Sequence, residues 1–190
     1  PRAGEVIESN SQVLKNLAKD WGCWISRIPP VTDREQDLEA AVDQGLDSDA
    51  EIVVVCAGSS AGSKDFTRKI FERKGEVLVH GINAMPGKPT LVAKSGNKLL
   101  VGAPGYPVSA VICFEQILYP IICWLQNQSV QTRPRVPLYL TRKMPSKLGQ
   151  EEFVRVSIGK VGNKMIGTPL SRGAGVLTSL TRAQGMIKIP

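Results

Sequence analysis

The chain has 190 residues, 42% of them apolar and 22% charged, which is typical of a globular protein with a sizeable core and one or two domains. Its net charge of +7 comes with only 5% aromatic residues and with scattered Lys and Arg, which argues against a nucleic-acid partner. No apolar run reaches the roughly 20 residues that span a bilayer, and no signal peptide is visible, so we expect no membrane partner.

Four helices are predicted from apolar residues at helical spacing. The first follows Asn10 and Ser11 as N-cap residues, and the second follows the capping box Thr32-x-x-Glu35. The other two are a helix that Asp65 caps and Gly75 ends, and a helix from Pro107 to Trp124 with a kink at Pro120.

Short apolar runs predict strands over residues 23–28, 51–57 and 77–82. The turn Ser95-Gly-Asn97 predicts a hairpin between residues 90–94 and 98–102. Strands that alternate with helices favour an α/β fold with a mostly parallel sheet, covered by helices on both faces.

The pattern changes after Gln126, where residues 127–132 are typical of a linker. Short alternating runs between Gly, Pro and Thr turns follow, at 137–141, 153–158, 164–167 and 186–189. We predict an α/β domain at residues 1–126 and a small β domain at 127–190. The chain starts without Met and stops within a strand-like run, so we expect it to be a piece of a longer protein.

Three loops of small residues lie where predicted strands end. They are Gly58-Ser-Ser-Ala-Gly-Ser-Lys-Asp65, Pro86-Gly-Lys-Pro89 and Pro104-Gly-Tyr-Pro-Val-Ser109. Such loops present backbone N–H groups and helix N-termini at one edge of an open α/β sheet, which is where these folds bind phosphate and other anions. The sequence therefore predicts a site for an anionic ligand.

The four cysteines, at positions 23, 56, 113 and 123, show neither a CxxC motif nor metal-ligand spacing. We interpret them as buried, unreactive thiols in a reducing, cytoplasmic compartment. The chain has a single histidine, His80, which argues against a zinc site or a Ser–His nucleophile.

The loops carry a family resemblance. Gly4-Glu-Val-Ile-Glu-Ser-Asn10 resembles the G-x-I-x-[DS]-[ST]-N opening of the molybdopterin-binding domain, and Gly58 to Phe66 is similar to its G-[GV]-[VS]-S-x-G-x-x-D-[YF] loop with one position fewer. Pro86-Gly-Lys-Pro89 and Pro104-Gly-Tyr-Pro-Val-Ser-Ala110 follow in the order and spacing of the family. Over nearly its whole length the chain resembles the MoeA/gephyrin family, the molybdopterin molybdenumtransferases.

The resemblance implies a three-layer α/β domain like those of MoaB and Mog proteins, followed by a small all-β domain like the C-terminal domain of MoeA. It implies an enzyme that binds adenylylated molybdopterin, inserts molybdate and hydrolyses the adenylate with a divalent metal, here Mg²⁺. It also implies a homodimer of the full-length protein. Phosphates and molybdate are anions, so loops rich in N–H groups and a few cations suit these substrates.

Roles follow for individual residues. Gly58, Ser59, Ser60, Gly62 and Ser63 match the backbone cradle for phosphate or pterin, with a flexible turn as the alternative. Pro86, Gly87, Pro104, Gly105 and Pro107 belong to the other two pterin-binding loops.

Four residues carry roles at the reacting groups, each with an alternative. Asp65 matches a catalytic residue that holds Mg²⁺, or it caps its helix. Lys88 matches a catalytic lysine that pairs with molybdate, or it is a solvated loop residue. Ser109 donates to the oxyanion or caps a helix. Arg155, in Phe153-x-Arg155, reaches molybdate or is a surface residue of a strand.

Two further positions are assigned to the pterin. Tyr106, which replaces a common Asn, places its ring against the pterin or packs within the protein, and Asn10 contacts ligand or caps its helix.

The chain departs from the family pattern at two places that concern molybdate. Met85 replaces the first lysine of the family motif K-P-G-K-P, and Gly173-Ala174-Gly175 stands where relatives often carry a Ser.

Two other functions stay open. A Mog-type molybdopterin adenylyltransferase shares the α/β domain but lacks the second domain and usually has a Gly-rich loop that ends in P-R-D. A scaffold without enzymatic activity is the third possibility, because gephyrin itself partly serves as one.

Overall fold

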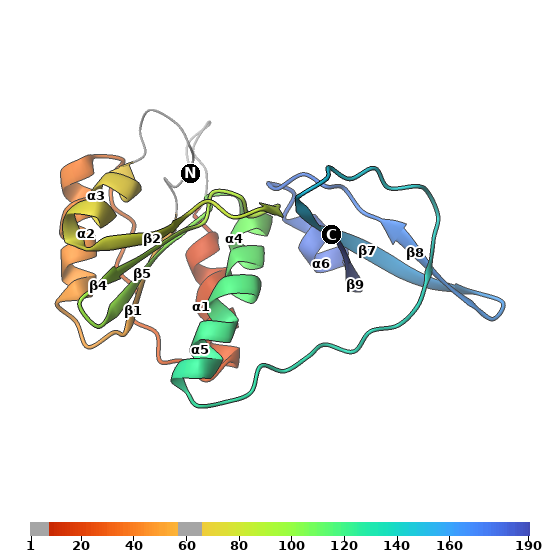
Figure 1. Cartoon of the computed structure of the whole chain (residues 1–190), viewed down its shortest axis with the longest axis horizontal. Coiled ribbons are helices and arrows are strands. Elements are labelled where there is room, and N and C mark those ends of the chain that lie inside the picture. The colour runs from red at the N-terminus through yellow and green to blue at the C-terminus, as the bar shows by residue number, and fades with distance from the viewer. Residues whose placement is uncertain (1–7, 57–65) are drawn as a thin grey trace.

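The computed structural model describes residues 8–56 and 66–190, which form an α/β body and a β-rich body joined by a long connection (Figure 1). The α/β body contains a four-stranded sheet in the order β1-β5-β4-β2. Its strands are β1 (Ile52–Cys56), β2 (Glu76–His80), β4 (Leu91–Ser95) and β5 (Lys98–Ala103). Its helices are α1 (Asn10–Asp20), α2 (Glu35–Leu46), α3 (Phe66–Lys74), α4 (Pro107–Cys113) and α5 (Tyr119–Leu125).

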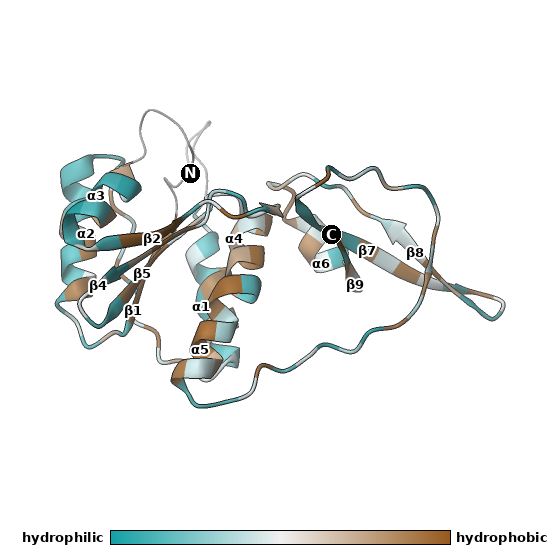
Figure 2. Ribbon diagram, in the orientation of Figure 1, coloured by the Kyte–Doolittle hydropathy of each residue, from teal (hydrophilic) through white to brown (hydrophobic). Residues whose placement is uncertain are grey.

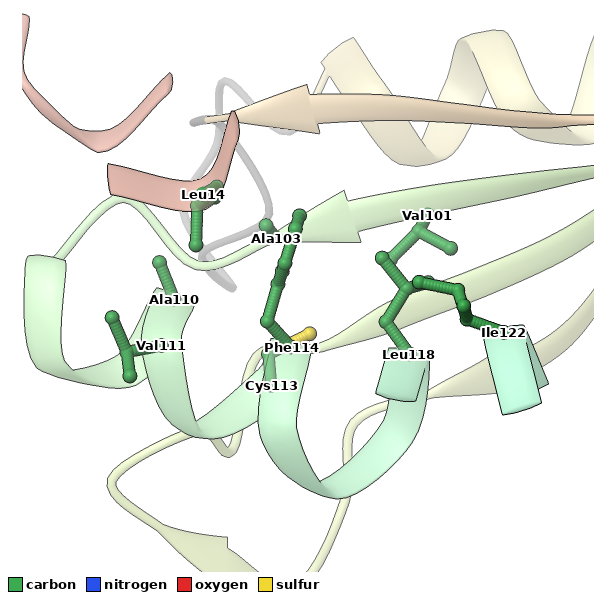
Figure 3. Packing of buried hydrophobic residues seen from close by; sticks show 9 residues of the cluster. All are labelled: Leu14, Val101, Ala103, Ala110, Val111, Cys113, Phe114, Leu118 and Ile122. Carbon is green, nitrogen blue, oxygen red and sulfur yellow. The ribbon is translucent and has the colours of Figure 1, made fainter. Parts of the chain in front are cut away.

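Helices cover both faces of this sheet, so the body has the three layers that we predicted. On one face α1 and the α4–α5 helix pack on Val101 and Ala103 of β5, as the close-up in Figure 3 shows. On the other face α2 and α3 bury Val42, Ile70 and Phe71 against β1, β4 and β5. Burial of each such side chain stabilises the fold by about 1.5–3 kcal/mol. Apolar residues accordingly concentrate on the strands and on α4–α5, whereas α2 and α3 are largely hydrophilic outside (Figure 2).

The prediction of a mostly parallel sheet is wrong. Strands β1 and β5 are parallel, but β4 runs antiparallel to both β5 and β2. The predicted hairpin explains the difference, because Ser95 pairs with Lys98 across a two-residue turn and so short a turn joins only antiparallel strands. Gly96, with φ of 59°, takes the first central position of that turn, where a left-handed conformation favours glycine.

A continuous 19-residue helix runs from Pro107 to Leu125, as predicted, and ends one residue beyond the expected Trp124. Its middle, Phe114–Leu118, is a π-helical turn that precedes Pro120, which lacks the N–H that an α-helical bond needs there. By length and composition alone this helix is apolar enough to cross a membrane; here it forms part of the core on one face of the sheet.

Three local predictions in the first domain are wrong. Residues 23–28 form no strand, and Trp24 is 98% exposed. The capping box at Thr32 is absent, because the Thr32 hydroxyl donates to the Asp37 carboxylate instead of bonding the helix backbone. Asn10 is the first residue of α1 and does not cap it.

The β-rich body consists of β6 (Tyr139–Leu140), β7 (Glu151–Val161), β8 (Lys164–Pro169) and β9 (Gly185–Ile189), close to the four predicted runs. It is not strictly all-β, since the short helix α6 (Thr178–Arg182) lies between β8 and β9. It also takes a strand from the first domain, because β3 (Ala84–Met85) pairs with the start of β7. The two bodies therefore share one sheet.

Candidate functional site

Three chain segments leave the first sheet at the same edge. Cys56, the last residue of β1, pairs with Ala103, the last residue of β5, and the two strands are parallel. His80 at the end of β2 pairs with Leu91 at the start of β4, and Leu91 in turn pairs with Gly102. The segments after Cys56, after His80 and after Ala103 thus start at one edge, as the loop positions predict.

The first of these loops lies outside the described residues. This applies to Gly58, Ser59, Ser60, Gly62, Ser63 and Asp65, whose roles in binding pterin, phosphate and metal stay predictions. Helix α3 begins at Phe66, directly after the predicted cap. Gly75 directly follows the last residue of this helix, and the position requires glycine because a Cβ there would lie 2.0 Å from the Lys94 carbonyl oxygen.

The second loop, residues 81–90, is closed by backbone hydrogen bonds. The Gly81 N–H donates to the Thr90 carbonyl, and the Ile82 N–H donates to the Lys88 carbonyl at 2.9 Å. Gly87 has a φ of 127°, which an L side chain rarely adopts, and it lies against Ile112 of α4. Pro86 and Gly87 are buried, whereas Lys88 is exposed and forms no ion pair within the described residues. The loop therefore presents the Lys88 ammonium to solvent from a fixed backbone.

The third loop connects β5 to α4. Asn10 donates a 2.7 Å hydrogen bond from Nδ2 to the Gly105 carbonyl, so its side chain fixes this loop instead of capping α1. Pro104 is buried, Gly105 and Tyr106 are exposed, and Pro107 is the first residue of α4. Ser109 is only 4% exposed, and the N-cap position of α4 belongs to Tyr106, so the alternative of Ser109 as a cap is wrong.

A loop of the β-rich body lies on the N-terminus of α4. The Val108 N–H donates to the Ala174 carbonyl at 3.0 Å, and Gly175 faces the Tyr106 ring, where a Cβ would be 3.4 Å from Cδ1. The first N–H groups of a helix have no carbonyl partner within the helix, and here the second domain supplies a partner for that of Val108. Sequence reasoning missed this contact, although the run of three small residues at 173–175 was visible.

An apolar cluster supports the contact between the bodies. Val108 and Ile112 of α4 pack with Ala84 of β3 and Phe153 of β7, and all four are almost fully buried. The site at the edge of the first sheet is consequently walled on one side by the second body.

Arg155 is a buried residue, 3% exposed, so the alternative of a surface arginine is wrong. Its guanidinium donates to the Ser171 carbonyl at 2.7 Å, to the Gly173 and Phe153 carbonyls and to the Ser179 hydroxyl. Burial lowers the pKa of this guanidinium. Arg155 thus holds both ends of the loop that lies on α4, and its contact with molybdate stays a prediction.

The described residues contain no group of three or more His, Cys, Asp or Glu side chains that could hold a metal ion. All four cysteines are free thiols. Cys113 is fully buried, and burial raises the pKa of Cys113 to about 11 and that of Cys56 to about 12. Such raised pKa values keep these two thiols protonated at neutral pH. Cys113 and Cys123 are buried as predicted, whereas Cys23 and Cys56 are only partly buried.

The first domain is a three-layer α/β domain, and a β-rich domain covers one side of the sheet edge from which its loops leave. Comparison with protein families identifies both parts: residues 2–123 match the "probable molybdopterin binding domain" and residues 137–190 match the "MoeA C-terminal region (domain IV)". The chain belongs to the MoeA family of molybdenum cofactor biosynthesis proteins.

Individual relatives agree with this assignment. A Methanocaldococcus jannaschii protein named for molybdopterin biosynthesis is 32% identical over 98% of this chain and 44% of its own length. The molybdopterin molybdenumtransferase of Haemophilus influenzae is 30% identical over 81% of this chain and 38% of its own length. The crystal structure of a MoeA protein from Pyrococcus horikoshii superimposes with a TM-score of 0.78 at 25% identity, covering all of this chain and 46% of that one. The chain spans less than half the length of these relatives.

Proposed function

We propose that this chain is the substrate-binding part of a molybdopterin molybdenumtransferase, which inserts molybdate into adenylylated molybdopterin and releases AMP. One observation carries the proposal: the loops at 81–90 and 104–109 leave the sheet at one edge, and the second domain covers that edge through Ala174 and Gly175. Family membership supports the choice of pterin and molybdate as ligands.

Among the described residues, we assign some to positioning the pterin and one, Lys88, to binding molybdate through its charge. Asn10 fixes the loop at Gly105 and so places the exposed Tyr106 ring as a wall for a planar pterin. Lys88 supplies a positive charge for molybdate from a loop whose backbone is fixed by Gly87 and Thr90. A fixed backbone lowers the entropy lost when an anion binds to such a lysine.

Mg²⁺ would neutralise charge on the phosphoanhydride that is hydrolysed. Asp65 is the proposed oxygen ligand, and it lies outside the described residues. The residues that are described offer no cluster of ligands for this ion, so we assign them no role in holding it. We further propose that the full-length protein is a cytoplasmic homodimer in which the partner completes the site.

A Mog-type adenylyltransferase is the second candidate, because the α/β domain alone would suit it. The contact between the domains favours the first candidate: Val108, at the start of α4, donates to the second domain, and Ile112 is buried against it. An adenylyltransferase without a second domain would leave this apolar end of α4 exposed.

The test uses the full-length protein with adenylylated molybdopterin, Mg²⁺ and molybdate, and it measures AMP release and pterin-bound molybdenum together. We expect AMP release that requires molybdate, with molybdenum recovered on the pterin. In a parallel reaction with molybdopterin and ATP, formation of adenylylated product would instead support the Mog-type function. No reaction in either assay would support a scaffold.

A further inference from the structure

The two domains differ sharply in charge. Residues 1–126 carry 13 Lys and Arg against 15 Asp and Glu, a net charge of −2. Residues 127–190 carry 11 Lys and Arg against only 2 acidic residues, a net charge of +9. Lys and Arg occur throughout both domains, but acidic residues are scarce in the second, so the net positive charge of the chain belongs to the second domain.

Part of this charge surrounds a small cavity. Arg142, Lys143, Met144 and Pro145, which follow β6, line it on one side, and Arg172 lines it on the other. Its volume is about 210 Å³. That is below the roughly 300–1,000 Å³ of pockets for drug-sized ligands, so the cavity suits a small ion with a few waters.

The two arginines are held in place by the protein. Arg172 donates from Nη1 to the Pro145 carbonyl at 2.9 Å, and the same nitrogen lies 3.1 Å from Oε2 of Glu152. Arg142 donates to the Pro169 carbonyl at 3.4 Å. Carbonyl partners fix a guanidinium but do not neutralise it, so the positive charge stays in the cavity.

Among the described residues, Glu152 is the one carboxylate that forms an ion pair with any of these cations, and it is 8% exposed. Its Oε2 atom has no hydrogen-bond partner of good geometry, although it lies close to Arg172. Within the described residues neither Arg142 nor Lys143 forms an ion pair with a carboxylate. Three cations and one carboxylate leave a net charge of +2 around the cavity.

We propose that this cavity binds a tetrahedral dianion, the chemistry shared by phosphate, sulfate and molybdate. A net charge of +2 matches such an ion, and the planar fork of an arginine fits two of its oxygens. The proposed site differs from the one at Lys88 in its residues, and it does not depend on the proposed enzymatic function. It is linked to that site in the chain, because Arg172 directly precedes the 173–175 loop that contacts Val108 and Tyr106.

The test is calorimetric titration of the protein with sodium phosphate, sodium sulfate and sodium molybdate at constant ionic strength. We expect saturable binding that Lys143→Gln and Arg142→Gln weaken at least fivefold. Lys143 suits the test because its side chain forms no hydrogen bond or ion pair with the other described residues. Lys160→Gln is the matched control, an equal change of charge on an exposed residue of β7, and it should leave the affinity unchanged.

Each outcome decides the proposal. Equal loss in Lys143→Gln and Lys160→Gln would show that only the overall charge of the domain attracts anions and would overturn it. Molybdate binding that Lys88→Ala abolishes and Lys143→Gln leaves intact would place the ion at the other site and overturn it as well. Competition between phosphate and molybdate for a site that needs Lys143 would support it, and preference for one ion would identify the source of the dianion.

Discussion

The two domains achieve stability in different ways. The α/β domain has a separate apolar cluster on each face of its sheet, and it neutralises its surface arginines and lysines with nearby carboxylates, as Arg73 does with Glu35 and Glu39. Among the described residues of the β-rich domain, the principal apolar cluster is shared with α4, and a buried arginine bonds carbonyls instead of carboxylates. The second domain therefore depends on the first domain for its apolar core, and the second domain supplies the net positive charge of the chain.

The apolar cluster shared by the two domains should give the largest effect on stability when it is truncated. Ile112→Ala should remove about 2–5 kcal/mol from the free energy of unfolding and should also release the second domain, since Ile112 is 1% exposed between the two. Ile122→Ala, a matched truncation at the other end of the same long helix, should destabilise the protein without releasing that domain. Urea unfolding followed separately by amide signals of each domain measures both effects. Equal release by both variants would contradict the shared core.

The second test concerns Arg155. Arg155→Ala should cost about 1.5–3 kcal/mol, because it leaves the Ser171 and Gly173 carbonyls without their charged donor. It should also speed hydrogen exchange of the Val108 amide, whose acceptor Ala174 lies in the loop that Arg155 holds. Arg182→Ala, at an exposed position of α6, should leave both quantities unchanged. Unaltered exchange at Val108 in the Arg155 variant would show that the loop is held by other contacts.

A third, smaller effect belongs to the first domain and follows from its buried thiols. Folding raises the pKa of Cys113 to about 11 and of Cys56 to about 12, so above pH 9 the unfolded chain binds fewer protons than the folded one. Stability should therefore be complete below pH 9 and fall by about 1 kcal/mol per thiol for each pH unit above it. Urea unfolding of wild type and Cys113→Ala between pH 8 and 10 measures this. A variant with the same pH dependence as wild type would show that Cys113 does not contribute.

The fourth test introduces charge where the two domains meet. Met85 is 44% exposed and pairs with Glu152 across β3 and β7. Met85→Lys restores the lysine of the family motif, and two unit charges about 4 Å apart attract by about 4 kcal/mol at an effective dielectric near 20, before desolvation is subtracted. We expect molybdate to bind a few-fold more tightly, with a gain that shrinks as salt rises. No gain at low salt would mean that the new ammonium pairs with Glu152 instead.

Sequence patterns predicted a turn and a helix start but not the helix caps, since Thr32 and Asn10 bond other groups. The hairpin across Gly96 and the helix that starts at Pro107 both depend on residues next to them, and both were confirmed. The strand predicted at 23–28 failed because alternation marks an extended chain but supplies no neighbour to pair with.

In the candidate site, too, some features could be predicted from the sequence and others could not. The two described loops could be placed from their small residues and the strands before them. The positions of Arg155 and Ala174 could not, because each depends on contacts between residues far apart in the chain. A motif with F-x-R spacing does not reveal whether its arginine bonds substrate, solvent or carbonyls of its own domain.

The most direct test of the proposed function compares Lys88 with Lys94 in the full-length protein. Both are exposed, and Lys94 lies near the opposite end of β4, so it controls for loss of a positive charge in the same region. Removal of a charged partner costs about 1.5–3 kcal/mol, so Lys88→Ala should reduce molybdate-dependent AMP release at least about tenfold, and Lys94→Ala should retain wild-type activity. Equal activity of the two variants would contradict the assignment of molybdate to this edge of the sheet.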